Sequence, residues 1–406
     1  MREAHAHVLA HGRAMDMVQL DACMSAQEML DAVADAAVGP RVVLAHGARP
    51  EAWNEPGWPT LEQLDHASPD ASVAAWCFDY HAIMLNGRAL EAIGVAIDTP
   101  DPAGGQIGRR PDGSLTGVLY EAAAGLAWSQ LEPKDIDPAA LARAVEDLSQ
   151  HGFAQVHDLK AQPELGEALA ASNAPDALGL TLYPLVQDLP EVLKTRKSWE
   201  SDRVRLGGGK IFVDGTLNSR TAWMLHPFAD GRAEHPSGMQ LMSDRQIEDA
   251  IRLCVDEGLQ LAAHAIGDAA VRAVLDAAER GRAPRGSVRI EHAELIDEAD
   301  VPRFGELGVI ASVQPCHLLY DIEALRRACP DRLDRVLPVR ELIDSGLKPG
   351  HNILFGSDTP IVRPDPEDSI LAATNRGRAD MALEDGIAPG QAVSEAEAWA
   401  CFDADA

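Results

Sequence analysis

Short runs of apolar and β-branched residues recur along this chain of 406 residues, and most of them precede a stretch with the apolar spacing of an amphipathic helix. Strands that alternate with helices pair in parallel, and eight of them can close into a barrel. The pattern therefore predicts an α/β fold, specifically a (β/α)8 TIM-type barrel. The eight predicted strands are residues 2–7, 153–158, 178–186, 208–214, 258–264, 287–292, 308–314 and 352–358.

Three helices can be placed from the residues at their ends. Ser25 followed by Glu28 predicts a capping box at the start of a helix over 25–38. Asp244 is the expected cap of a helix over 244–258, which would end at a glycine. The segment 268–281 has the same apolar spacing and is also expected to be helical.

Residues 40–135 interrupt the alternation of strands and helices with many prolines, glycines and tryptophans. We expect a long insertion after the first strand, with a small sheet or hairpin of its own. It divides the chain into residues 1–39, which begin the barrel, and residues 136–406, which complete it. Loops that follow barrel strands lie on the active-site face, so the insertion is expected to cover that face and to supply the substrate pocket.

Composition narrows the class of protein. Hydrophobic residues make up 46% and charged residues 24% of the chain, and no apolar run approaches the roughly 18 residues that a membrane span needs. The formal net charge of −29 argues against nucleic acid or an anionic membrane as a partner. The first residues, "MREAHAHVLAHG", lack the features of a signal peptide.

The six cysteines have neither paired nor metal-finger spacing, and a chain of this length does not need disulfides to fold. We therefore expect reduced thiols and a cytoplasmic protein. The cysteines are Cys23, Cys77, Cys254, Cys316, Cys329 and Cys401.

Residue types that bind metals stand singly near the ends of five predicted strands. Each has an ordinary structural explanation when taken alone, such as a helix cap or a buried histidine. Because the carboxyl ends of barrel strands meet at one mouth, however, the set predicts a site for a divalent metal that activates water for hydrolysis. The candidates are His5, His7, Lys210, His264, His292 and Asp358.

For two of these motifs, the residue types and their spacing give a specific chemical reason to expect metal binding. His5 and His7 are two residues apart on a strand, so both can face one ion, whereas His11 is expected at the surface. Lysine is scarce, and Lys210 follows three glycines at the start of an apolar strand. A buried lysine has a lowered pKa, and its neutral amine can take up carbon dioxide to form a carbamate that bridges two metals. The glycines do not form a phosphate loop. "GGGKI" lacks the first glycine of that motif at the right spacing, and it lacks the Ser or Thr after lysine.

With these ligand motifs, the chain resembles the amidohydrolase superfamily, specifically the amidohydrolase family 3 branch that includes N-substituted formamide deformylase-like metal-dependent hydrolases. The resemblance covers nearly the whole chain and is specific for family and fold, though not for substrate. It also rests on "PTLEQLD", "HAIMLNGRALEAIGV", "DGSLTGVLYEAA", "GFAQVHD", "KIFVDGTLNSRTA", "HAIGD", "RIEHAE", "ASVQPCHL" and "GSDTP".

The resemblance implies one metal held by His5, His7 and Asp358 and a second held by His264 and His292, bridged by Lys210 as a carbamate. Zinc is the expected ion, although iron or manganese would suit the same ligands. Catalysis would depend on Asp358, Lys210 and His292, with Asp358 carrying a proton from the attacking water to the leaving nitrogen of a small amide-type substrate.

Further residues are expected to support the site or to bind the substrate. His157 and Asp158 match the family's second strand and are expected to support the site rather than to act in catalysis. The substrate-binding candidates are His81, Asn86, Glu121, Asp214, Arg220 and Gln314.

The chain departs from the family pattern at both ends. Members usually carry a β-sandwich built from segments before the H-x-H motif and after the eighth barrel unit, and both segments are missing here. Glu3 also stands where the family usually has Asp. A mis-assigned start with a frameshift, a sequence trimmed to the barrel, and a natural barrel-only protein all explain this. Exposed barrel edges would favour a homo-oligomer.

Three functions compete. The leading hypothesis is a metal-dependent hydrolase of carbon–nitrogen bonds outside peptides, with an amide, formamide or cyclic amide as substrate. The second is a mononuclear deaminase or an ester or lactone hydrolase on the same scaffold, for which an unmodified Lys210 and one metal per chain would be the signs. The third is a catalytically inactive truncated scaffold, against which the complete ligand set argues.

Overall fold

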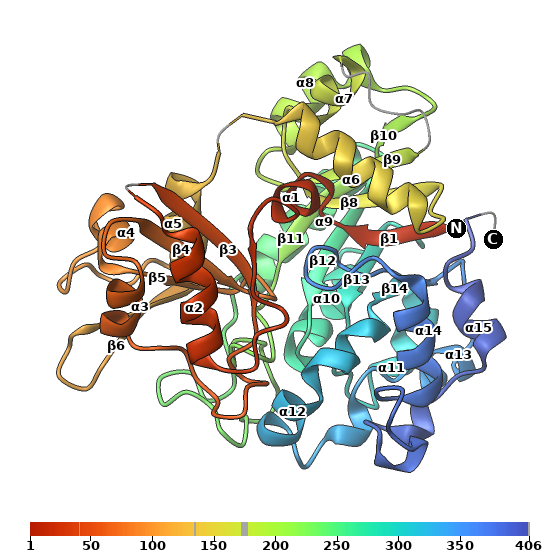
Figure 1. The fold of residues 1–406 in the computed structure, drawn as a ribbon. Coiled ribbons are helices and arrows are strands. Elements are labelled where there is room, and N and C mark those ends of the chain that lie inside the picture. Colours follow the sequence, from red (N-terminus) through yellow and green to blue (C-terminus); the bar gives the residue numbers. More distant parts are fainter. Residues whose placement is uncertain (40, 134, 172–177, 405–406) are drawn as a thin grey trace. The chain divides into compact units, whose positions relative to one another are not determined.

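The computed structural model describes residues 1–39, 41–133, 135–171 and 178–404. The chain divides into two compact units (Figure 1). The first comprises Met1–Gly12 and Ile136–Ala406, and the second comprises Arg13–Asp135. The second unit therefore contains the described part of the predicted insertion, residues 40–135. It also contains the described residues from Arg13 to residue 39, which were predicted to belong to the barrel.

Parallel strands form the first unit, and every strand predicted from the apolar runs is present. Two parallel sheets are formed, with the strand orders β1-β8-β9-β10 and β11-β12-β13-β14-β15. Isolated parallel bridges join Ala6 to Thr359 and Leu185 to Lys210. The strands are β1 (Arg2–Ala6), β8 (Gln155–Ala161), β9 (Gly179–Pro184), β10 (Val204–Leu206), β11 (Gly208–Phe212), β12 (Gln260–Ala265), β13 (Val288–His292), β14 (Ile310–Val313) and β15 (Ile353–Phe355). The three-residue β10 was not predicted, because it is too short to show a periodic pattern.

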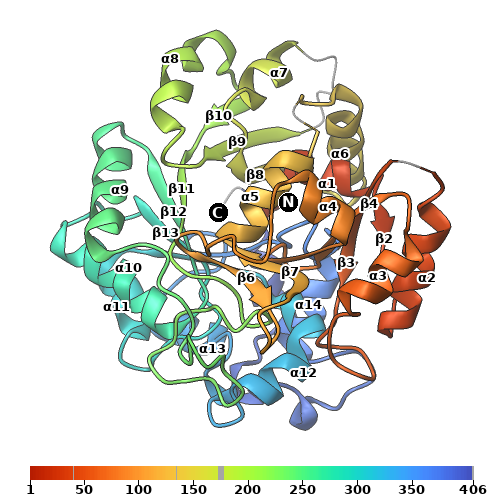
Figure 2. The same ribbon diagram turned by 90° about the vertical axis from the view of Figure 1, so that its left-hand side faces the viewer.

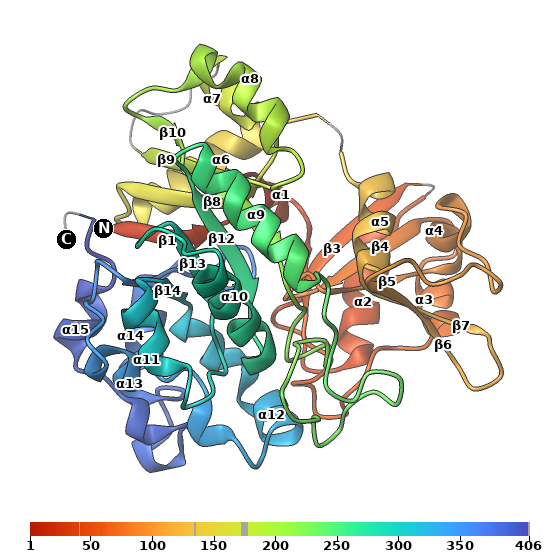
Figure 3. The same cartoon turned by 180° about the vertical axis from the view of Figure 1, so that it is seen from behind.

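Helices pack on the outer side of these strands, as α9 and α10 do beside β12 (Figures 2 and 3). They bury apolar stripes against an extensive core of Val, Leu, Ile and Ala. The helices are α1 (Val8–Ala14), α6 (Pro138–Gln150), α7 (Leu165–Ala171), α8 (Leu189–Trp199), α9 (Asp244–Asp256), α10 (Asp268–Arg280), α11 (Val301–Leu307), α12 (Leu318–Ala328), α13 (Val339–Asp344), α14 (Pro366–Asn375) and α15 (Glu395–Ala400). The first unit is thus an α/β structure with parallel sheets.

The second unit has a mixed sheet with the order β2-β3-β4-β5-β7-β6, which confirms the prediction that this segment has a sheet of its own. Its parallel strands β2 to β4 are followed by antiparallel pairs. The elements are β2 (Val18–Gln19), α2 (Ala26–Ala36), β3 (Val42–Ala48), α3 (Leu61–Ala67), β4 (Ser72–Cys77), β5 (Ala82–Leu85), α4 (Gly87–Ala92), β6 (Gly105–Arg109), β7 (Leu115–Glu121) and α5 (Ala122–Leu131).

Two of the predicted helix caps differ from those observed. Helix α9 is capped by Ser243, which forms a capping box with Gln246, so the prediction of Asp244 as the cap was wrong by one residue. At α2, Ser25 accepts from the Glu28 backbone as predicted. The Glu28 carboxylate instead accepts from the backbone of Met24, so only half of the capping box forms.

The glycines before Lys210 allow close packing rather than phosphate binding. A Cβ on Gly208 would lie 1.8 Å from the carbonyl oxygen of Gln260, and one on Gly207 would lie 2.6 Å from the ring of Tyr183. Only glycine permits β11 to approach its neighbours this closely.

All six cysteines are buried and unpaired, as their spacing predicts. Within the described residues, none of the helices has both the length and the apolar character needed to cross a membrane.

Candidate metal centre

The loop after β15 is tied to β1 by backbone hydrogen bonds. The Asp358 N–H donates to the His5 carbonyl at 2.7 Å, and the His7 N–H donates to the Thr359 carbonyl at 2.8 Å. The buried carboxylate of Glu3 accepts from the N–H groups of His5 and Ser357 at 2.9 and 3.0 Å. These bonds place the Asp358 carboxylate beside the two histidines, although the strand and the loop are separated by most of the chain.

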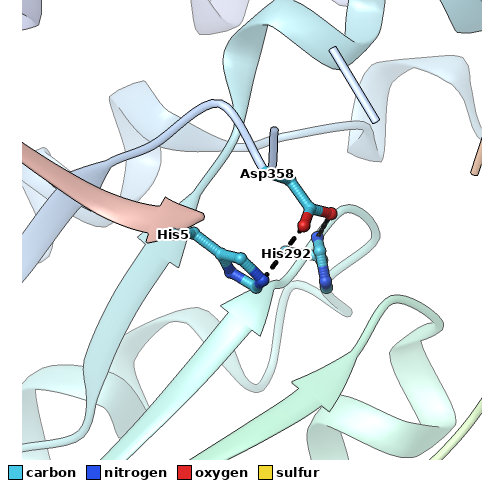
Figure 4. A group of neighbouring side chains, drawn as sticks. All are labelled: His5, His292 and Asp358. Atoms are coloured by element: carbon cyan, nitrogen blue, oxygen red, sulfur yellow. Dashed lines mark ion pairs between the residues drawn. The ribbon is translucent and has the colours of Figure 1, made fainter. Parts of the chain in front are cut away.

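Histidine nitrogens converge on the Asp358 carboxylate. Its Oδ1 lies 3.2 Å from His5 Nε2, and its Oδ2 lies 3.9 Å from His292 Nδ1 (Figure 4). Oδ1 also lies 3.0 Å from His7 Nε2. One ligand atom from each of His5, His292 and Asp358 lies within 4.8 Å of the others. The structure therefore brings together four of the six predicted ligands.

Several donor atoms of this cluster are buried without a hydrogen-bond partner among the described residues. They are His5 Nε2, Lys210 Nζ, His292 Nδ1 and Asp358 Oδ1. Buried polar atoms are almost always hydrogen-bonded, so a concentration of exceptions needs an explanation. Imidazole nitrogens and a carboxylate oxygen are donors that a divalent ion accepts, and the residues present fit such an ion.

Two of the cluster residues have a strained backbone. His292 has φ 71° and Asp358 has φ 63°, both in the left-handed region that side chains other than glycine rarely adopt. Such conformations cost free energy and persist where the surrounding structure enforces them, often at functional sites.

A buried carboxylate orients the first histidine. Glu291 Oε2 lies 2.7 Å from His5 Nδ1, and the other oxygen of Glu291 accepts from Arg289. Arg289 also donates to Ser312 Oγ and to the Ala4 carbonyl. Burial alone would raise the pKa of Glu291, but the charge of Arg289 holds it well below its usual range. Glu291 can accept a hydrogen bond from His5 Nδ1, and in that tautomer Nε2 would be available to a metal ion.

Lys210 and His264 occupy the neighbouring strands. Lys210 is 1% exposed, its ammonium lies 5.1 Å from the centre of the Phe212 ring, and burial lowers its pKa to about 8. The His264 ring lies 4.5 Å from that of His292, while its Nε2 lies 3.1 Å from the Gly215 carbonyl oxygen. Among the described His, Cys, Asp and Glu side chains, His264 is not part of the groups whose ligand atoms converge within 4.8 Å.

Asp214 and Arg220 order the long loop after β11. The Asp214 carboxylate accepts from the backbone N–H groups of Trp223, Ile266 and Gly267 at 2.8–3.0 Å. Arg220 forms a bidentate pair with Asp230 and donates to two carbonyls of its own loop. The Asp214 carboxylate also lies 3.7 Å from His264 Nε2, so it stands beside a predicted metal ligand as well as ordering the loop.

The other candidate in the first unit, Gln314, lies at the donor cluster. Its Nε2 is 3.5 Å from His5 Nδ1 and donates to the Ser312 carbonyl, and its Oε1 is buried without a hydrogen-bond partner in the described chain. His157 contacts Arg289 at 2.8 Å, and burial raises the pKa of the neighbouring Asp158 to about 7.

The remaining candidates belong to the second unit. His81 Nδ1 lies 2.7 Å from Glu121 Oε2. Asn86 is fully buried and caps α4 through Ala89, and its amide also contacts Val73, Ser68 and Ala71. Its side chain therefore joins several segments of the second unit, and the substrate contact proposed from the sequence stays a prediction.

Sequence reasoning missed four polar residues beside the metal donors, namely Arg289, Glu291, Glu294 and His317. His317 Nδ1 lies 3.5 Å from Glu294 Oε1. Burial alone would lower the pKa of His317, but Glu294 and Asp358 together raise it to about 9. The motifs "RIEHAE" and "ASVQPCHL" contain all four residues, yet periodicity gives no sign that their side chains meet.

His11 is buried and not at the surface, contrary to the prediction. Its Nε2 contacts Asp147 at 2.9 Å, and its Nδ1 contacts the hydroxyl of Thr359 at 2.9 Å. It ties the residue after Asp358 to helix α6.

Comparison with known proteins adds a family to this geometry. A family described as "Amidohydrolase family" matches residues 1–402. The chain is 29% identical over 402 residues to the protein LONG AFTER FAR-RED 3 of Arabidopsis thaliana, covering 92% of this chain and 67% of the relative. It is 28% identical over 363 residues to the N-substituted formamide deformylase of Arthrobacter pascens, covering 84% of this chain and 65% of that enzyme.

A similar solved structure is an uncharacterised metal-dependent hydrolase from Pyrococcus horikoshii OT3. It has a TM-score of 0.74 and 25% sequence identity, and the match covers 98% of this chain and 78% of that one. The fold likeness therefore extends over both compact units.

Proposed function

The chain belongs to the amidohydrolase family and is a metal-dependent hydrolase of carbon–nitrogen bonds other than peptide bonds, and from this premise we propose that it cleaves N-substituted formamides or similar secondary amides. The observation that carries the proposal is the convergence of buried, unpartnered donors from His5, His292 and Asp358. The formamide class is suggested by the named activity of the Arthrobacter pascens relative.

We further propose that the parallel strands of the first unit close into an eight-stranded barrel, as the sequence predicts. The bridges from Ala6 to Thr359 and from Leu185 to Lys210 support it, because the first joins β1 to the loop after β15 and the second joins the end of β9 to β11. Closure would gather the carboxyl ends of β1, β11, β12, β13 and β15 at one mouth.

The ligands would be divided as in the family pattern. His5, His7 and Asp358 would hold one ion, and His264 and His292 a second, with a carbamate of Lys210 between them. Zinc is the proposed metal, and when bound it polarises a carbonyl and lowers the pKa of water. The low pKa that burial gives Lys210 favours the neutral amine from which a carbamate forms.

The residues of the chain would move the proton. His5 and His7 lie beside the Asp358 carboxylate and hold its pKa well below the usual range, although burial alone would raise it. This carboxylate can therefore accept the proton of the attacking water and deliver it to the leaving nitrogen. Gln314, with its buried Oε1 without a partner in the described chain, is the proposed contact for a substrate N–H.

A mononuclear hydrolase remains the second candidate, and one observation favours it. The ligand atoms of His5, His292 and Asp358 converge without any contribution from Lys210, whose ammonium has no hydrogen-bond partner among the described residues. One ion held by that group would leave the lysine unmodified.

The test is release of formate and free amine from a panel of N-substituted formamides, N-acyl amines and cyclic amides. Activity should disappear with a chelator and return with zinc.

Asp358→Asn should lower kcat by about 10²–10⁴-fold if Asp358 transfers the proton. Asp230→Asn, which removes a carboxylate paired only with Arg220 in the described contacts, is the matched control and should retain most activity. Failure of the zinc-loaded protein to cleave every member of the panel would contradict the proposal.

A further inference from the structure

A second group of donors lies beside the cluster described above. Glu294 follows β13 two residues after His292, and His317 ends the short 3-10 helix η1 (Pro315–His317) after β14. The rings of His292 and His317 are stacked, with centroids 5.9 Å apart and planes inclined by 30°. His292, Glu294 and His317 are 3%, 5% and 6% exposed, so all three are removed from bulk water.

The contacts of His317 with neighbouring carboxylates are longer than those of a close ion pair. His317 Nδ1 lies 3.5 Å from Glu294 Oε1, and His317 Nε2 lies 3.9 Å from Asp358 Oδ2. Good hydrogen bonds to a carboxylate are shorter, at roughly 2.7–2.9 Å. Both His317 Nε2 and His292 Nδ1 are buried without a hydrogen-bond partner in the described chain. The group therefore offers buried nitrogen atoms that no hydrogen bond of the described chain occupies.

One ligand atom from each of His292, Glu294 and His317 lies within 4.8 Å of the other two. Two imidazoles and a glutamate form a donor set that zinc accepts in hydrolases. Donors bound at about 2.1 Å from one ion lie at most about 4.2 Å apart, so the group needs only small adjustments to coordinate. The negative charges of the Glu294 and Asp358 carboxylates would also attract a cation to this group of side chains.

We propose that His292, Glu294 and His317 form a further metal-binding position, next to the one bounded by His5, His7 and Asp358. This inference rests on the proposed metal dependence of the chain but assigns ligands outside the family pattern. His292 would be shared, so this position is an alternative to His264 and His292 as the place of the second ion.

The alternative for His317 is an ordinary ion pair with Glu294. In that case the histidine binds no metal, whether or not it contacts the substrate. The two alternatives differ in metal binding, because an ion pair would be indifferent to metal whereas a ligand would not. Removal of a metal ligand or of its orienting partner commonly weakens metal binding by about 10–100-fold.

The experiment is zinc titration of the metal-free full chain against a chromophoric chelator, for the wild type, His317→Asn and Glu294→Gln. The control is His46→Asn, a buried histidine of the second unit that belongs to no convergent donor group among the described residues. Cobalt absorption spectra of the same proteins report ligand loss independently of activity, and circular dichroism verifies folding.

We expect two binding steps in the wild type and in His46→Asn. In His317→Asn and Glu294→Gln, one step should be lost or weakened by at least about 10-fold, with the cobalt spectrum changed. Folded variants with both steps unchanged would overturn the inference while leaving the proposed hydrolase intact. A wild type that binds no metal would instead overturn the proposed function itself, and this inference with it.

Discussion

His5 Nδ1 lies 2.7 Å from Glu291 Oε2, and both side chains are almost completely buried. Glu291 is in turn paired with Arg289, which also bonds the carbonyl of Ala4 just before His5. The pair thus fixes both the ring and the backbone of the histidine that faces Asp358. A metal ligand held in this way has its nitrogen oriented before any ion arrives.

Glu291→Gln should therefore weaken metal binding by about 10–100-fold, because the amide cannot hold the His5 proton on Nδ1 as firmly. It should also lower the free energy of unfolding by about 3–5 kcal/mol, since Arg289 loses its buried counter-charge. Chelator competition and urea denaturation measure the two effects. Glu341→Gln, which removes a partly buried carboxylate paired with Arg335, is the control. Equal metal affinity in Glu291→Gln and the control would contradict an orienting function.

Gly356→Ala should disturb the site through its backbone. An added Cβ would lie 2.5 Å from both Glu3 Oε1 and the His5 nitrogen, so either the loop or β1 must move. We expect a loss of about 1–3 kcal/mol in stability together with weaker metal binding. Gly390→Ala, where a Cβ would meet nothing within 4 Å, should be nearly neutral in the same unfolding and titration measurements. The prediction fails if the two alanine variants behave alike.

Asp158 predicts a pH dependence of stability in the metal-free protein. Burial raises its folded pKa to about 7 from an ordinary value near 3.8, so the folded state holds a proton that the unfolded state releases. Its contribution is fully present below the unfolded pKa and is lost as pH rises through about 7. The slope of the unfolding free energy against pH reports how many more protons the folded state binds than the unfolded state. Asp158→Asn should lower this number by about one between pH 4 and 7. Glu3, whose pKa burial also raises to about 7, keeps part of the slope in both proteins. Chemical denaturation across that pH range gives the slope, and identical slopes would show that Asp158 is not the group responsible.

The fold of the first unit is readable from sequence because its strands are buried on both faces. Continuous apolar runs such as "LAAH" in β12 and "NILF" before Asp358 stand out against polar connections. The end of each run then places His264 and Asp358 without further information. The position of a helix cap can be predicted only to within one residue here. Ser243 and Asp244 are adjacent, and Ser and Asp are both good caps.

The residues around the metal donors could not be predicted in the same way. Arg289 and Glu291 alternate with apolar residues on β13, a pattern that usually means a solvent-facing side, yet both are buried. His317 follows a proline in a 3-10 turn, where periodicity says nothing about direction. His11 is buried only because Asp147 and Thr359, both distant in sequence, contact its ring. Long-range pairing decides all of these positions.

The most direct test of the central claim is the metal content per chain, measured by mass spectrometry on protein produced with zinc and bicarbonate, in comparison with Lys210→Ala. About two ions in the wild type and a clear loss in the variant are predicted, because a carbamate of Lys210 would join the two positions. Binding of one ion that is unaffected by the substitution would contradict the bridged centre, and the absence of bound metal from the wild type would contradict the metal-dependent hydrolase altogether.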